Sequence, residues 1–87
     1  MKNILNTKQM NKVKIASIIN EICEENNYNL VNENTTNFLE LKFREDIGFD
    51  SFNLAQLTVM IEDEFDVDVF EDGVVETVGE IIIKIKK

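Results

Sequence analysis

Few side chains in this sequence of 87 residues could perform chemistry unaided. There is no histidine to act as a base or a metal ligand, and the one cysteine, Cys23, cannot build a thiolate metal site. A glycine-rich phosphate loop of the Walker type is also missing from the sequence. We therefore expect neither an enzyme nor a metal site, and the main candidate group is the hydroxyl of Ser51.

Ser51 directly follows Asp50 at the point where a helical pattern begins. An aspartate in this position can be the N-cap, where its carboxylate accepts hydrogen bonds from amides of the first turn. Ser51 then takes the first helical position with an exposed hydroxyl. The amides and the dipole of the helix N-terminus favour an anion near that hydroxyl. The plainer alternative is an ordinary helix-start serine.

The helix that would position this hydroxyl is predicted from Ser51 to Phe65, because apolar residues recur there on one face. The core face consists of Leu54, Leu57, Ile61 and Phe65. A last helix follows Thr77, which forms a capping box with Glu80. Its apolar face consists of Val78, Ile81, Ile82 and Ile85. The intervening segment from Asp66 to Val75 allows one short helix or an irregular turn.

A first helix is predicted from about Thr7 to Glu25. Its apolar face consists of Ile15, Ile18, Ile19 and Ile22, and Cys23 beside it is expected to be a small buried hydrophobic residue. A long connection then reaches Asp50, and connections of this length are either functional or held by their own apolar side chains. The anchors expected are Leu30, Phe38, Leu41, Phe43 and Ile47. The sequence also allows a turn of helix around Asn37 to Leu41.

Three main helices, one short helix and no alternating strand pattern predict an all-α fold, a small bundle with a long loop between its first two main helices. We expect one domain over residues 1–87, with residues 1–6 frayed. The net charge of −8 should repel nucleic acid and anionic membranes and favour partners with basic surfaces. One cysteine, no signal peptide and no apolar membrane span predict a cytoplasmic protein without membrane insertion, which we expect to be a monomer.

The segment from Phe43 to Phe52 resembles the signature of the acyl carrier and peptidyl carrier protein family. That signature is an aromatic residue, an acidic pair, an aliphatic residue, glycine, any residue and then Asp-Ser-Leu, and here it reads Phe-Arg-Glu-Asp-Ile-Gly-Phe-Asp-Ser-Phe. The similarity continues through Leu57, Ile61 and the acidic run that follows, and it resumes at Thr77. The context makes the short Asp-Ser motif specific.

This resemblance implies that Ser51 is esterified by a phosphopantetheinyl transferase, which takes a 4′-phosphopantetheine arm from coenzyme A with Mg²⁺. The chain would then be an acyl or aminoacyl carrier without catalysis of its own. It would hold its cargo as a thioester and present it to cargo-loading and cargo-using enzymes. Asp50 would be the helix cap beside the site.

The helix that begins at Ser51 also bears an apolar stripe that its core face does not explain: Phe52, Ala55 and Val59. In a carrier this is where partner enzymes dock. Glu62 and Asp63 flank the stripe and would pair with basic residues of the partner. For Phe52 the alternative is that its ring folds back over the long loop.

Departures from the family pattern bear on the type of carrier. The positions of Asn53 and Gln56 are usually acidic in the carriers of general fatty-acid synthesis, and Phe52 replaces the commoner leucine. These differences favour a specialised stand-alone carrier over a housekeeping carrier of fatty-acid synthesis. Carriers of D-alanine often read Asp-Ser-Phe, so an aminoacyl cargo stays open.

Two alternatives to the carrier belong to other classes of protein. The chain could be an acidic helical interaction module of the same fold that works unmodified on a basic partner. A calcium-binding EF-hand over Asp66–Gly73 is rejected, because aligning Gly73 with the loop glycine puts Phe70 at a ligand position and Gly79 where the bidentate glutamate belongs.

Overall fold

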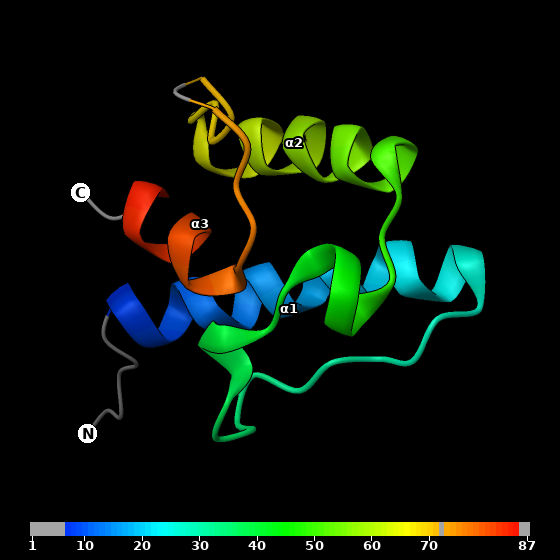
Figure 1. Ribbon diagram of the computed structural model, residues 1–87. Coiled ribbons are helices and arrows are strands. Elements are labelled where there is room, and N and C mark those ends of the chain that lie inside the picture. Colours follow the sequence, from blue (N-terminus) through cyan, green and yellow to red (C-terminus); the bar gives the residue numbers. More distant parts are fainter. Residues whose placement is uncertain (1–6, 72, 86–87) are drawn as a thin grey trace.

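The computed structural model describes residues 7–71 and 73–85 of the chain, and the side chains from residue 9 onward within these ranges. The long helices are α1 (Thr7–Asn26), α2 (Ser51–Phe65) and α3 (Val78–Ile85). α1 and α2 pack together with opposite chain directions, and α3 lies beside the N-terminal half of α1 (Figure 1). The described residues contain no strand, only an isolated antiparallel bridge between Lys42 and Thr77. The predicted small all-α fold is confirmed.

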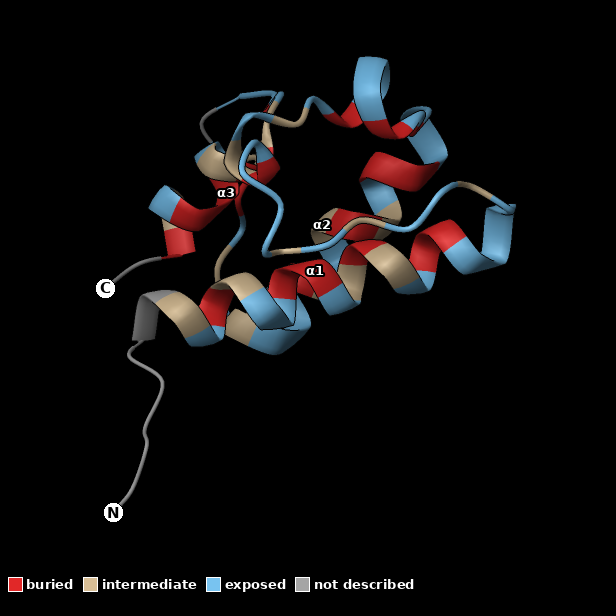
Figure 2. Cartoon of the chain, turned by 90° about the horizontal axis from the view of Figure 1, so that it is seen from below, coloured by how far each residue is buried: buried red, intermediate tan, exposed pale blue. Residues whose placement is uncertain are grey.

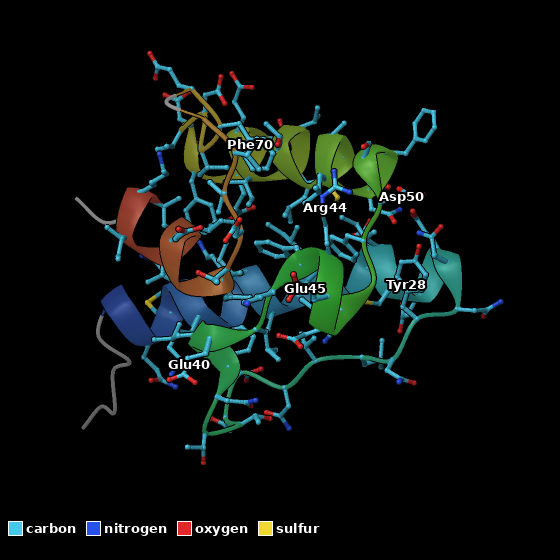
Figure 3. All side chains as sticks on the ribbon, viewed as in Figure 1. Tyr28, Glu40, Arg44, Glu45, Asp50 and Phe70 are labelled. Carbon is cyan, nitrogen blue, oxygen red and sulfur yellow. The ribbon has the colours of Figure 1, made fainter. Side chains whose placement is uncertain are left out.

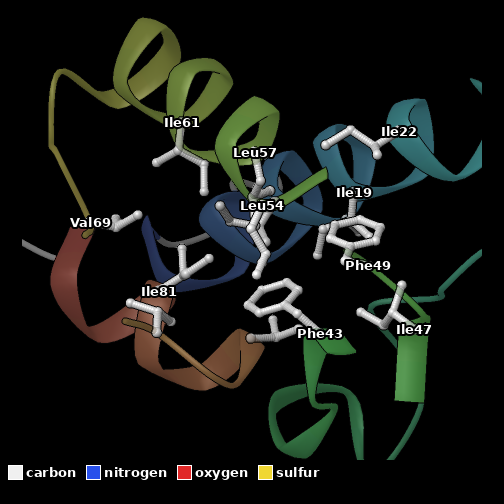
Figure 4. Close-up of a cluster of buried hydrophobic side chains, with 14 of the residues drawn as sticks. Ile19, Ile22, Phe43, Ile47, Phe49, Leu54, Leu57, Ile61, Val69 and Ile81 are labelled. Carbon is white, nitrogen blue, oxygen red and sulfur yellow. The ribbon is translucent and has the colours of Figure 1, made fainter. Parts of the chain in front are cut away.

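The core lies between the three helices and the connection that joins α1 to α2. Ile19, Leu57 and Ile81 come from the three helices and are fully buried, and Phe43 enters the same cluster from the connection (Figure 4). The predicted apolar faces are buried, except that Ile18 and Phe65 are only partly so. Cys23 is buried as expected, and this burial raises the pKa of its thiol.

The long connection after α1 is held by polar contacts as well as by its anchors. Asn20 of α1 binds both backbone groups of Val31: its Nδ2 donates to the carbonyl at 2.9 Å, and its Oδ1 accepts from the amide at 2.7 Å. No residue from 27 to 37 is buried, and this stretch is pale blue and tan in Figure 2. Leu30 was expected to be an anchor, but its side chain is exposed, so that expectation is wrong.

Two short helical segments interrupt the second half of this connection. A 3₁₀ turn, η1 (Phe38–Glu40), lies where a turn of helix was predicted. A π-helical turn, η2 (Phe43–Ile47), follows and ends at Gly48, which adopts a left-handed conformation with φ of 100°. The carbonyl of Phe43 accepts hydrogen bonds from the amides of both Gly48 and Phe49. The chain is thereby folded back on itself just before α2 begins.

For the segment between α2 and α3 the sequence allowed a short helix or an irregular turn, and the described residues are irregular. Its described residues form turns, closed by hydrogen bonds from Glu71 N to Asp68 O and from Gly73 N to Phe70 O. α3 then opens with the predicted capping box of Thr77 and Glu80, whose two hydrogen bonds measure 3.3 and 3.1 Å.

The fraying predicted for residues 1–6 and the terminal lysines 86 and 87 lie outside the described residues. Within the described part of the chain, no helix is both long enough and apolar enough to cross a membrane.

Candidate functional site

Ser51 is the first residue of α2, and its side chain is exposed. Asp50 is the N-cap, as predicted: its backbone is extended, and its Oδ1 accepts a hydrogen bond of 2.9 Å from the amide of Asn53. Because the aspartate satisfies the helix end, the hydroxyl of Ser51 is not required for capping. The amides of the first two helical positions have no acceptor within the helix and point toward the same end.

The neutral side chain of Asn53 was taken to distinguish this chain from carriers of general fatty-acid synthesis, in which the position is usually acidic. In the structure Asn53 is 5% exposed. Its Oδ1 accepts from the backbone amide of Asp50 at 2.9 Å, which completes a capping box, and also from the hydroxyl of Tyr28 at 2.9 Å. The signal that could have revealed the first contact is its place three residues after an N-cap aspartate.

The second neutral amide, Gln56, also has a hydrogen-bond partner in the chain. Gln56 is half-buried, and its Nε2 donates to Glu25 Oε1 of α1 at 2.9 Å in an exposed contact. Both amides therefore make hydrogen bonds that link α2 to the rest of the domain. Their neutrality says little about the charge that docking partners meet.

Three aromatic rings pack in a row next to the start of α2. Tyr28 lies against Phe49 with ring centroids 6.0 Å apart, and Phe49 stacks on Phe43 at 5.9 Å. Phe43 and Phe49 are buried. The row therefore joins the end of α1, the η2 turn and the residue that precedes Asp50 into one packed unit.

Arg44 is a site residue that sequence reasoning missed. It extends from η2 toward α2, as Figure 3 shows, and its Nη2 donates to Ser51 Oγ at 3.2 Å. It is the only arginine in the sequence. The signature as stated has no position for Arg44, which stands between the aromatic residue and the acidic pair, and Arg44 does not share a helix with Ser51. The contact arises from the fold of η2 against the helix start.

A hollow of about 230 Å³ lies beside Ser51 on the side of Arg44. Its lining includes Leu54, Ala55 and Phe70. A smaller hollow of about 90 Å³ shares Arg44 and Leu54 with it and is lined further by Phe43. The surface next to the hydroxyl is therefore mainly apolar, with one cationic group at its edge.

The apolar stripe predicted on α2 lies on the surface. The side chain of Phe52 is 83% exposed and that of Val59 is 65% exposed, and Ala55 is exposed as well. The alternative in which Phe52 folds back over the loop is therefore wrong. Glu62 and Asp63 are exposed and lie in one shallow hollow with Val59. These positions agree with a docking stripe, and docking itself stays a prediction.

The acidic residues of the described chain do not gather into a metal site. In residues 7–71 and 73–85, no group of three acidic or cysteine side chains is arranged to hold a metal ion. Ion pairs at the surface link Lys14 to Glu64 and Lys42 to Glu45.

Comparison with known families bears directly on this site. A sequence model described as the phosphopantetheine attachment site matches residues 14–82, which include most of α1, the η2 turn, all of α2 and the first half of α3. Members of the matched family attach a covalent 4′-phosphopantetheine group and are non-catalytic carriers that interact with a phosphopantetheinyl transferase and with partner enzymes. No solved structure matches the chain.

Proposed function

The chain belongs to the phosphopantetheine-attachment family of carrier proteins, and from that premise we propose that Ser51 carries its 4′-phosphopantetheine arm. The observation that supports this most directly is the exposed hydroxyl of Ser51 at the capped first residue of α2. The sequence contains one other serine, Ser17, which lies in the middle of α1 and has no helix end beside it.

The residues around Ser51 suit a phosphate ester. The free amides and the dipole of α2 favour an anion at this end of the helix. The guanidinium of Arg44 already lies at hydrogen-bond distance from the oxygen that would bear the phosphorus. Asp50 is an anion nearby, but its Oδ1 is occupied by the amide of Asn53.

The arm supplies a terminal thiol on which a cargo is held as a thioester. The protein's own contribution is to hold the attachment point at the surface of a rigid helix, beside an apolar hollow and an apolar stripe. We infer that the described residues act as one carrier domain for acyl or aminoacyl cargo. A phosphopantetheinyl transferase and the cargo enzymes would meet it through Phe52, Ala55 and Val59, with Glu62 and Asp63 pairing with basic groups.

We still favour a specialised carrier over a carrier of general fatty-acid synthesis, but fewer residues support this than the sequence suggested. Asn53 no longer supports it, because that side chain is buried. Phe52 does support it, since a fully presented ring next to the attachment residue offers partners a larger apolar contact than the usual leucine. Partners that fit this ring would distinguish the chain from a general carrier.

Mass spectrometry tests the attachment directly. The unmodified protein is incubated with coenzyme A, Mg²⁺ and a broad-specificity phosphopantetheinyl transferase. We expect the mass of one phosphopantetheine to be added to the wild type and to Ser17→Ala, and none to Ser51→Ala. No mass gain in folded wild type with several transferases would contradict the proposal and favour an unmodified interaction module.

A further inference from the structure

Arg44 is a cation whose partner in the fold is a neutral hydroxyl. Its guanidinium has five N–H donors, of which Nη2 binds Ser51 Oγ at 3.2 Å. Among residues 7–71 and 73–85, no carboxylate lies within ion-pair distance of it, although the chain has 17 acidic residues. Lys42, two residues earlier, pairs with Glu45 at 3.4 Å. Arg44 is thus close to Ser51, and the acidic side chains of the described residues leave most of its hydrogen-bonding capacity unused.

The backbone beneath Arg44 is fixed. The amide of Phe43 donates to Glu76 O at 2.9 Å, and the carbonyl of Phe43 accepts from Gly48 and Phe49. The ring of Phe43 is 1% exposed. The base of the Arg44 side chain therefore cannot move far from the start of α2, and its contact with Ser51 follows from the core packing of η2.

We propose that Arg44 binds the phosphodiester of the arm and so sets the position of the arm's first atoms. This inference rests on the proposed attachment at Ser51. An ester formed on Ser51 Oγ puts two non-bridging oxygens, which share one negative charge, next to a group that already touches this atom. A guanidinium is suited to paired hydrogen bonds with phosphate oxygens, and such charge-assisted bonds are stronger than its present bond to a hydroxyl.

Charge balance gives an independent reason for a cation at this place. The chain has a net charge of −8, and the new phosphodiester would lie beside the carboxylate of Asp50. Like charges at short range raise the free energy of the modified state. Arg44, on η2, offsets this repulsion with its positive charge. The amides of the first turn of α2, which point along the helix axis, also stabilise the anion. The cation and the helix end therefore enclose the phosphate from two directions.

Nuclear magnetic resonance of the single arginine tests this proposal on the wild type. Because Arg44 is the only arginine, one side-chain Nε–H resonance appears in the ¹⁵N spectrum of the protein. On conversion of the unmodified to the phosphopantetheinylated protein, we expect this resonance to shift and its exchange with water to slow. Added NaCl should reduce both effects, because salt screens exposed charges. An Nε–H resonance that is the same in both forms would overturn the proposal.

Two variants test the same contact from the side of the phosphate. Arg44→Gln and Lys42→Gln each remove one positive charge from the same segment, but only Arg44 touches Ser51. In the modified proteins, the ³¹P resonance of the phosphodiester should be offset from that of free phosphopantetheine in the wild type and in Lys42→Gln. The offset should shrink in Arg44→Gln, and an equal offset in all three proteins would contradict the role of Arg44.

The two proposals fail in different ways. Absence of the phosphopantetheine mass from the wild type removes the attachment at Ser51 and this inference with it. A normal mass gain together with unchanged Nε–H and ³¹P resonances removes the role of Arg44 alone. If the positive charge acted without contact, the ³¹P offset would shrink equally in Lys42→Gln and Arg44→Gln.

Discussion

Two substitutions on opposite faces of α2 separate its core face from its docking stripe. Leu57 is 0% exposed and packs in the core, so Leu57→Ala leaves a cavity and should cost about 2 to 5 kcal/mol of unfolding free energy. Small domains have about 5 to 15 kcal/mol in total, so this is a large share. Phe52 is 83% exposed, and Phe52→Ala should change the unfolding free energy by less than about 0.5 kcal/mol.

The expected effect of Phe52→Ala is on partners. An exposed aromatic ring that becomes buried in a complex contributes strongly to binding. A loss of about 1 to 2 kcal/mol corresponds to about 5- to 30-fold in the kcat/KM of phosphopantetheine transfer. Ile83→Ala is the matched control, since Ile83 is 73% exposed but lies on α3 away from the start of α2.

Urea unfolding followed by circular dichroism gives the stabilities, and mass spectrometry of timed samples gives the transfer rates. The role of Phe52 in docking is refuted if Phe52→Ala is as destabilising as Leu57→Ala. It is equally refuted if Phe52→Ala and Ile83→Ala are modified at the same rate as the wild type.

Three further predictions concern the contacts that hold the helix ends. Tyr28→Phe removes a hydrogen bond to Asn53 and should cost about 0.5 to 1.5 kcal/mol in urea unfolding, whereas an unchanged midpoint would contradict that bond. Gly79→Ala should lower the free energy of unfolding by about 1 to 3 kcal/mol, although alanine has the better helix propensity. The reason is that the added Cβ would lie 2.9 Å from the backbone oxygen of Leu39. A variant more stable than the wild type would refute this. Hydrogen bonds from the amides of Glu76 and Thr77 lower the pKa of Glu80, so Glu80→Gln should have a lower free energy of unfolding than the wild type at neutral pH. This difference should disappear as the pH falls and Glu80 becomes protonated in the folded protein. A difference that is constant with pH would argue against this.

The parts of the fold that the sequence predicted are those with local signals. The helix starting at Ser51 was predicted with the observed bounds, because its apolar period and the N-cap Asp50 lie within one segment. The capping box of Thr77 and Glu80 was found for the same reason. The same period placed Phe52 opposite the core face but left open whether its ring folds back over the loop, and its 83% exposure decides against that alternative.

The parts that were missed depend on where the long connection runs. The hydrogen bond between Tyr28 and Asn53 joins residues 25 positions apart, and that between Arg44 and Ser51 joins residues seven apart across a turn. Neither pair lies on one continuous helix or strand, so no period along the chain brings its members together. The exposure of Leu30 has the same origin, because its neighbour Val31 is fixed by Asn20, and hydropathy does not show which of two adjacent apolar residues turns inward.

The same packed unit positions both the hydroxyl and the cation of the candidate site. Phe49 precedes the cap of α2, and Phe43 precedes Arg44, and these two rings stack on each other at 5.9 Å. The carbonyl of Phe43 also accepts the amide of Phe49 at 2.8 Å, so the two backbones are tied at this point. The separation of the Arg44 and Ser51 backbones is therefore set by buried contacts, while both side chains are exposed. A phosphate added at Ser51 would lie within reach of a guanidinium whose backbone is already in place, so the loss of conformational entropy on pairing is confined to the Arg44 side chain and the arm.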